Sequence, residues 1–152
     1  MGLYLSYAGV GHLIVQSLIV KRAVRWLGER GAAIAGYGLT SIGFLIFATV
    51  SNGLFFPIGT PFYNMAGLVG PAVQSQMTRK VGPTEQGRLQ GAVAGLSSLT
   101  GMTAALVFTT VFSFAAAPGH EAFPPGLHLY LAAAVLLTGA VLALRNMRPK
   151  GA

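Results

Sequence analysis

The sequence has no cysteine, no aspartate and few charges of either sign. Charged residues make up 9% of the 152 residues, against about 25% in a typical soluble domain, while 53% are hydrophobic and the mean hydropathy is +0.65. Without cysteine there is no disulfide framework and no thiolate metal site. The three glutamates lie in predicted loops. These residues provide no paired carboxylates and no nucleophile with a base, so we expect no enzyme and no cofactor. No Walker-type loop occurs, so we expect no ATP-driven pump.

Long uncharged runs take the place of a soluble surface. A transmembrane helix needs about 20 predominantly apolar residues. Five segments meet this requirement, at residues 3–20, 32–50, 54–77, 89–115 and 127–144. We therefore expect an all-α membrane protein in which five transmembrane helices form a single bundle over residues 1–152.

The basic residues alternate with uncharged connections along the chain. All ten lysines and arginines fall within residues 21–30, 79–88 and 145–150, whereas the connections at 51–53 and 116–126 contain none. The positive-inside rule then predicts an N-terminus outside and a C-terminus in the cytoplasm. The net charge of +7 is thus a topology signal, and we expect no nucleic-acid partner. Because an odd number of helices with an outside N-terminus is unusual, we expect a fragment of a longer membrane protein.

His12 lies near the middle of the first segment and so close to the bilayer midplane. Gln16 follows one turn later on the same face, within hydrogen-bonding reach of the imidazole. Two interpretations stay equally open. The pair ties two helices together, or His12 takes up a proton near neutral pH and couples proton movement to transport.

The third segment is interrupted by Pro57, Pro61 and Pro71. Such breaks occur in membranes where neighbouring helices or a water-filled cavity satisfy the freed backbone groups. Asn64 and Gln74 fall near one face of this segment together with Pro71. This face predicts either a polar cavity or a kinked packing helix whose amides bond to neighbours.

Small residues recur at helical spacing in three segments. They are Ala32, Gly36 and Thr40 in the second; Gly87, Gly91 and Gly95, continued by Ser98 and Met102, in the fourth; and Ala132, Gly139 and Ala143 in the fifth. Such faces let two helix backbones approach closely, and we favour packing over ligand contact for them. Gln90, Ser97 and Thr100 add weak polarity beside the glycines of the fourth segment.

The connections carry helix-end signals. Gly28 is suited to a helix C-cap or turn, Thr84 to the N-cap of the fourth helix, and Glu85 to the first turn that follows. In the outer connection, His120 and Glu121 are a weak pair of metal ligands, and we expect them to be solvated rather than to hold a metal.

Three stretches together resemble one known family. They are His12 and Gln16 followed by Leu27–Arg30, then Gly70–Gln74 leading to Arg79, and then Glu85–Gly91, the most specific of the three. With these stretches the chain resembles the C-terminal part of a major facilitator superfamily transporter of the tetracycline/proton antiporter branch. The similarity covers most of residues 8–101.

The resemblance implies helices eight to twelve of a twelve-helix fold in the bacterial cytoplasmic (inner) membrane, without the N-terminal half of the transporter. It places His12 at the family's proton-coupling histidine and implies a small-molecule substrate and protons as partners, beside membrane lipid. The cavity candidates are Asn64, Gln74 and Ser97. The cytoplasmic loop and helix-packing motif consists of Arg79, Glu85, Gln86, Gly87, Gln90, Gly91 and Gly95. We expect a part of a drug exporter that is inactive alone; the alternative is a free-standing small membrane protein that associates with another membrane protein.

Overall fold

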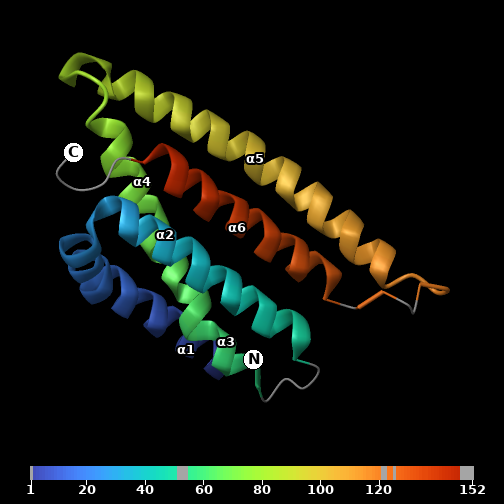
Figure 1. The fold of residues 1–152 in the computed structure, drawn as a ribbon. Coiled ribbons are helices and arrows are strands. Elements are labelled where there is room, and N and C mark those ends of the chain that lie inside the picture. Colours follow the sequence, from blue (N-terminus) through green and yellow to red (C-terminus); the bar gives the residue numbers. More distant parts are fainter. Residues whose placement is uncertain (1, 51–54, 121–122, 125, 148–152) are drawn as a thin grey trace. The chain divides into compact units, whose positions relative to one another are not determined.

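The computed structural model describes residues 2–50, 55–120, 123–124 and 126–147. The regular structure of these residues is helical, and no strand occurs among them (Figure 1). The expected all-α class is confirmed. Three helical stretches are long and apolar enough to cross a membrane: Gly2–Thr49, Pro83–Ala115 and Leu127–Asn146. The chain divides into two compact units, one comprising Met1–Gln76 with Leu129–Ala152 and the other Met77–His128.

The first helical stretch folds back on itself at a glycine. It consists of α1 (Gly2–Ile14), the π-helix η1 (Val15–Ile19) and α2 (Val20–Thr49). Within α2, Gly28 has φ 71° and ψ 174°, a conformation that side chains with a Cβ rarely adopt. The part of α2 beyond Gly28 runs in the opposite direction to α1 (Figure 1), and α2 contacts η1. The turn predicted at Gly28 is confirmed.

The third predicted segment is broken into three short helices. These are α3 (Phe56–Asn64), the 3₁₀-helix η3 (Met65–Leu68) and α4 (Val69–Thr78). The predicted interruption is therefore present, but the irregular turn follows Asn64 rather than a proline. Pro57 lies at the start of α3, where a backbone N–H has no helical acceptor to lose, and Pro71 lies in the first turn of α4. Pro61 alone lies inside a helix.

Small residues form the core of the first unit. Ala32 and Ala33 of α2 and Ala72 of α4 are fully buried, and Gly36 and Thr40 are buried on the same face of α2. A Cβ at Gly36 would come within 2.8 Å of the Val69 side chain. The small face predicted for the second segment is confirmed, because it is the surface on which η3 and α4 pack.

Helix α6 (Leu127–Asn146) uses its small residues in the same way. Ala133, Ala140 and Ala143 are buried, and a Cβ at Gly139 would lie 2.9 Å from the ring of Tyr37 on α2. Ala132, which belongs to the predicted small face, is only half-buried. The predicted face is therefore correct at Gly139 and Ala143. The buried face differs from the prediction in containing Ala133 and Ala140 in place of Ala132.

The second unit contains the 3₁₀-helix η4 (Pro83–Glu85) and α5 (Gln86–Ala115). The N-cap predicted at Thr84 is wrong. Pro83 pre-sets a helical φ, so the turn starts before Thr84, and the N–H of Glu85 bonds to the carbonyl of Gly82 at 3.0 Å. No side chain caps the start of α5.

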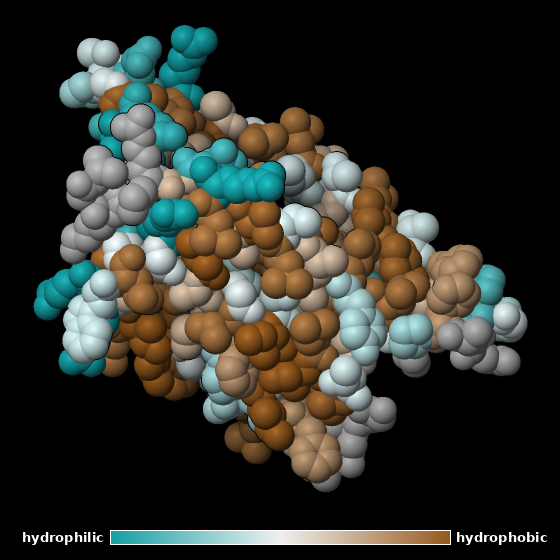
Figure 2. Space-filling model, in the orientation of Figure 1, coloured by the Kyte–Doolittle hydropathy of each residue, from teal (hydrophilic) through white to brown (hydrophobic). Residues whose placement is uncertain are grey.

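Hydrophobic side chains cover most of the surface visible in Figure 2, as expected for helices in lipid.

Candidate functional site

His12 lies in the last turn of α1 and Gln16 in the π-helix η1 that follows. Both side chains are exposed, so the other helices of the first unit leave them accessible. The hydrogen bond expected between them is not formed in the described part of the chain. The Gln16 amide lies instead beside η3, since a Cβ at Gly67 would be 3.6 Å from its Nε2.

The π-helix is defined by its backbone and supported by a side chain. The N–H of Val20 bonds to the carbonyl of Val15, five residues earlier, as in a π turn. The hydroxyl of Ser17 donates to the carbonyl of Leu13 at 2.7 Å. Single π turns inside α-helices are frequent at functional sites. Here the irregular turn begins three residues after the proton-coupling candidate His12.

The π-helix packs against the irregular turn of the third segment. Val15 is buried, 3% exposed, and η1 contacts η3. A Cβ at Gly67 would lie 3.3 Å from Cγ1 of Val15 and 3.6 Å from Nε2 of Gln16. Glycine at position 67 therefore leaves room for the Gln16 amide. The structure brings Gln16 next to the break in the third segment, which sequence periodicity alone could not predict.

Asn64, a cavity candidate, is buried at the contact between α3 and α1. Its amide donates to the carbonyl of Ala8 at 3.3 Å, and the space beside it is provided by Gly11, where a Cβ would collide with the amide nitrogen. Ala8 is one helical turn before His12, so Asn64 packs on the same stretch of α1. The sequence left two interpretations of this face, a polar cavity or a kinked packing helix. The position of Asn64 is the one expected for the packing helix, because its amide bonds to a neighbouring helix.

Two tyrosines of α1 complete this contact, and sequence analysis did not single out either for it. The hydroxyls of Tyr4 and Thr60 are 3.0 Å apart, and the hydroxyl of Tyr7 donates to the carbonyl of Pro57 at 3.5 Å. That carbonyl has no helical donor because residue 61 is proline and lacks an N–H. The signal was available in the sequence: a proline inside a membrane helix leaves a carbonyl four residues earlier that a neighbour must satisfy.

A second set of polar contacts joins the other ends of the helices in the first unit. Ser75 of α4 donates to a carboxylate oxygen of Glu29 at 2.6 Å. Arg30 donates to the carbonyl of Leu144, in the last turn of α6, at 2.5 Å. A cation at a helix C-terminus satisfies carbonyls that have no helical donor and interacts favourably with the helix dipole. Gln74, another cavity candidate, is half-buried on α4 beside this network.

The remaining motif residues lie in the second unit. Arg79, Glu85, Gln86, Gly87, Gln90, Gly91, Gly95 and Ser97 are exposed. A Cβ at Gly87, Gly91 or Gly95 would meet nothing within 4 Å in the described part of the chain. The close helix contact predicted for this glycine face therefore stays a prediction. Ser97 belongs to the second unit, whereas Asn64 and Gln74 belong to the first, so a cavity shared by the three stays a prediction.

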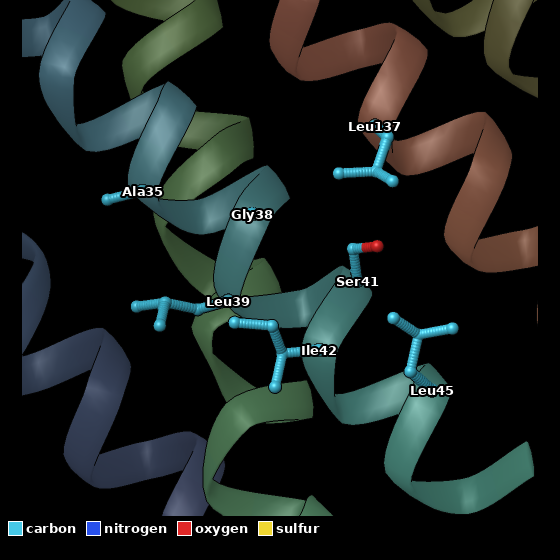
Figure 3. A pocket seen from close by; sticks show the side chains of 7 residues that line it. All are labelled: Ala35, Gly38, Leu39, Ser41, Ile42, Leu45 and Leu137. Carbon is cyan, nitrogen blue, oxygen red and sulfur yellow. The ribbon is translucent and has the colours of Figure 1, made fainter. Parts of the chain in front are cut away.

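A shallow apolar groove of about 490 Å³ lies between α2 and α6. Figure 3 shows Leu137 of α6 facing the α2 residues Ser41 and Leu45 across it. None of the predicted cavity residues lines this groove. The hydroxyl of Ser41 donates to the carbonyl of Ala133 at 3.1 Å, so the polar group at its edge serves helix packing.

The outer connection contains a histidine in an aromatic cluster. His120 is half-buried and its ring stacks on Phe114 with centroids 4.2 Å apart. The prediction that it is solvated is wrong, because Phe114 and Phe123 cover its ring. Glu121 lies outside the described residues. Among those described, no three histidine, cysteine or acidic side chains gather in a metal-ligand cluster.

Comparison with known proteins identifies one group of relatives. The chain is 33% identical to the class C tetracycline resistance protein of Escherichia coli over 133 residues, which is 86% of this chain and 33% of the relative. It is 33% identical to the class G protein of Vibrio anguillarum and 32% identical to the class B protein of Escherichia coli, over 74% and 71% of this chain and 29% and 27% of those relatives.

No family model and no solved structure matches the chain. The chain spans about a third of the length of the curated relatives it matches. The predicted resemblance is confirmed: the chain is a relative of the tetracycline resistance proteins, which are major facilitator exporters, and an integral membrane protein of the bacterial inner membrane.

Proposed function

We propose that this chain is part of a proton-coupled secondary transporter that exports a drug-like small molecule such as tetracycline, and that it does not transport alone. The observation that carries the proposal is the similarity itself, which extends over 86% of this chain but only a third of the class C relative. Alternating access needs two halves that rock about a shared site. A chain of this size provides at most one of them.

The proposed topology has five transmembrane segments with the N-terminus outside and the C-terminus inside. Gly2–Thr49 has 48 residues, and a straight helix of that length would span about 72 Å, more than twice a hydrocarbon core of about 30 Å. The turn at Gly28 divides it into two lengths that each fit. The three short helices from Phe56 to Thr78 supply a further segment, and α5 and α6 supply the last two.

The absence of native cysteine makes this topology directly testable. Single cysteines at Ala117 or Asn52 should react with a membrane-impermeant maleimide on intact cells. Cysteines at Arg22 or Lys80 should react only after the membrane is made permeable. Labelling of all four sites from outside would contradict the topology.

In the proposed mechanism His12 takes up and releases the coupling proton, Gln74 and Ser97 face the substrate pathway, and Asn64 holds α3 against α1 through its bond to Ala8. The π turn beside His12 supports this role, since such turns are frequent where a helix carries function. The motif Arg79 to Gly95 forms the cytoplasmic connection and the helix face that packs on the remainder of the transporter. Each of these roles is part of the proposal.

The decisive experiment combines this chain with the missing part. Cells sensitive to tetracycline would receive the chain alone, the portion of the class C relative that it does not match, or both. We expect proton-driven tetracycline efflux only from the combination. In the combination, His12→Ala should abolish efflux at unchanged membrane levels of the chain, while Tyr130→Phe serves as a control. Efflux by the chain alone, or undiminished efflux with His12→Ala, would contradict the proposal.

One observation favours a second candidate, a small membrane protein that associates with another membrane protein. The glycine face of α5 at Gly87, Gly91 and Gly95 is uncovered in the described residues, and such faces commonly receive a partner helix. Replacing Gly91 by Leu should disrupt such a complex. The same replacement should have no effect if the protein acts alone. A stable monomer in detergent, with no partner co-purified, would count against this candidate.

A further inference from the structure

The turn between α1 and the main part of α2 carries basic residues and the only tryptophan of the chain. Lys21, Arg22 and Arg25 are exposed, and Trp26 is 83% exposed. All four lie in the first two turns of α2, before the reversal at Gly28. At about 100° per residue they fall within an arc of about 140° on one face of the helix.

The opposite face of the same turn is fixed to the core of the first unit. Ala23 and Val24 pack against the buried cluster of Ala32, Ala33 and Ala72. Gly28 is buried and holds the reversal with its positive φ. The basic face is therefore presented outward by a packed helical turn rather than by a free loop.

The acidic residue nearest to this turn in the sequence is engaged by another helix. Glu29 accepts a hydrogen bond from Ser75 of α4, and it is the only acidic residue before Glu85. The next residue, Arg30, donates to the α6 carbonyl of Leu144. Two exposed cations, Lys21 and Arg22, thus add to a positive field on this face.

The position of this turn, directly after an apolar segment, indicates which kind of anion its basic residues would bind. Lys21 is the first charged side chain after the apolar residues 2–20, and Leu18 just before it is 62% exposed. In a membrane protein this boundary lies at the headgroup level, where tryptophan rings are also enriched. A phosphate group beside the cations, with an acyl chain along the apolar surface next to them, would satisfy both kinds of contact.

We propose that Lys21, Arg22 and Trp26 form a binding site for the headgroup of an anionic phospholipid. Exposed basic residues next to a membrane segment attract acidic lipids with roughly a fivefold enrichment per cation, and the attraction falls as salt screens it. The site does not depend on transport activity.

Because Trp26 is the single tryptophan, its fluorescence reports on this site alone. The full chain would be reconstituted into phosphatidylcholine vesicles containing equal fractions of phosphatidylglycerol, with bromine on the acyl chains of one lipid or the other. Bromine quenches the tryptophan only at close range. We expect brominated phosphatidylglycerol to quench Trp26 several times more effectively than brominated phosphatidylcholine, and added salt to reduce the difference.

The double variant Lys21→Gln with Arg22→Gln should remove the preference, whereas Lys80→Gln with Arg88→Gln, an equal loss of exposed charge elsewhere, should leave it. Circular dichroism checks that each variant keeps its helix content. Equal quenching by the two brominated lipids would overturn the proposal, as would a preference that survives in the Lys21 and Arg22 variant. Inorganic phosphate at constant ionic strength should not compete; if it abolishes the preference, the site binds free anions and the lipid assignment is wrong.

Discussion

The contact between α2 and α3 at Gly43 gives the sharpest prediction of stability. A Cβ at this position would lie 2.7 Å from the backbone N of Tyr63 and 3.1 Å from the carbonyl oxygen of Gly59. Ordinary contacts begin at 3.4 Å, so the two backbones would have to separate by 0.7 Å (3.4 minus 2.7). No side chain can move aside to avoid this, because the obstructing atoms are main chain.

Overpacking of this kind typically costs about 1 to 3 kcal/mol. We expect Gly43→Ala to lower the free energy of unfolding by that amount, measured by titrating a denaturing detergent into mixed micelles and following helical circular dichroism. Gly38→Ala is the matched control on the same helix, since nothing lies within 4 Å of its Cβ position. There the gain in helix propensity should stabilise by roughly 0.5 to 1 kcal/mol. If Gly43→Ala were as stable as Gly38→Ala, the proposed packing of α3 on α2 would be refuted.

Three further changes test other contacts by the same unfolding measurement or by hydrogen exchange. Tyr4→Phe removes the hydroxyl that pairs with Thr60 and should cost about 0.6 kcal/mol, typical of a polar contact between membrane helices; no loss of stability would argue against this contact. Arg30→Gln should speed amide exchange in the last turn of α6, near Leu144, while exchange in α5 stays unchanged; equal protection in both proteins would exclude a capping role. Gly28→Ala should destabilise by about 1 to 3 kcal/mol, because alanine is strained at φ 71°, and a neutral effect would mean that the chain reverses elsewhere.

The sequence predicted the parts of the fold that depend on local chemistry. Uncharged run lengths located the helices, and the small residues Ala32, Gly36 and Thr40 identified a buried face, because close packing of helices requires them wherever the partner comes from. Gly28 identified a reversal since its conformation is available mainly to glycine. These features are properties of a residue and its near neighbours.

Features that depend on contacts between segments were not predicted. The π turn after Ile14 leaves no periodic signal in an apolar run, and the Gln16 amide lies beside Gly67 of η3 rather than on the expected partner His12. The pairing of Tyr7 with the carbonyl of Pro57 depends on which helix neighbours α3. His120 was placed in solvent from its loop position alone, but aromatic residues from the end of α5 and the adjoining loop cover it.

For the candidate site, sequence reasoning selected polar residues inside apolar helices and could not say which of them meet. The structure joins Asn64 to the turn of α1 before His12 and leaves Ser97 in a separate unit. The roles proposed for these residues in transport go beyond the contacts that the described residues make. Those roles are therefore assigned by the efflux experiments proposed above.

The π turn holds one residue more than an α-helical turn, because the N–H of Val20 bonds five residues back to Val15. Deleting one residue within Val15–Ile19 would let a regular α-helix run through with Val20 and all later residues close to their present rotation. Ala23 and Val24 would then stay against the core. The same deletion within the regular α-helical turns between Val20 and Gly28 would turn every residue after it, up to Gly28, by about 100°. The chain should therefore tolerate the loss of one residue in the π turn far better than the loss of one residue in α2.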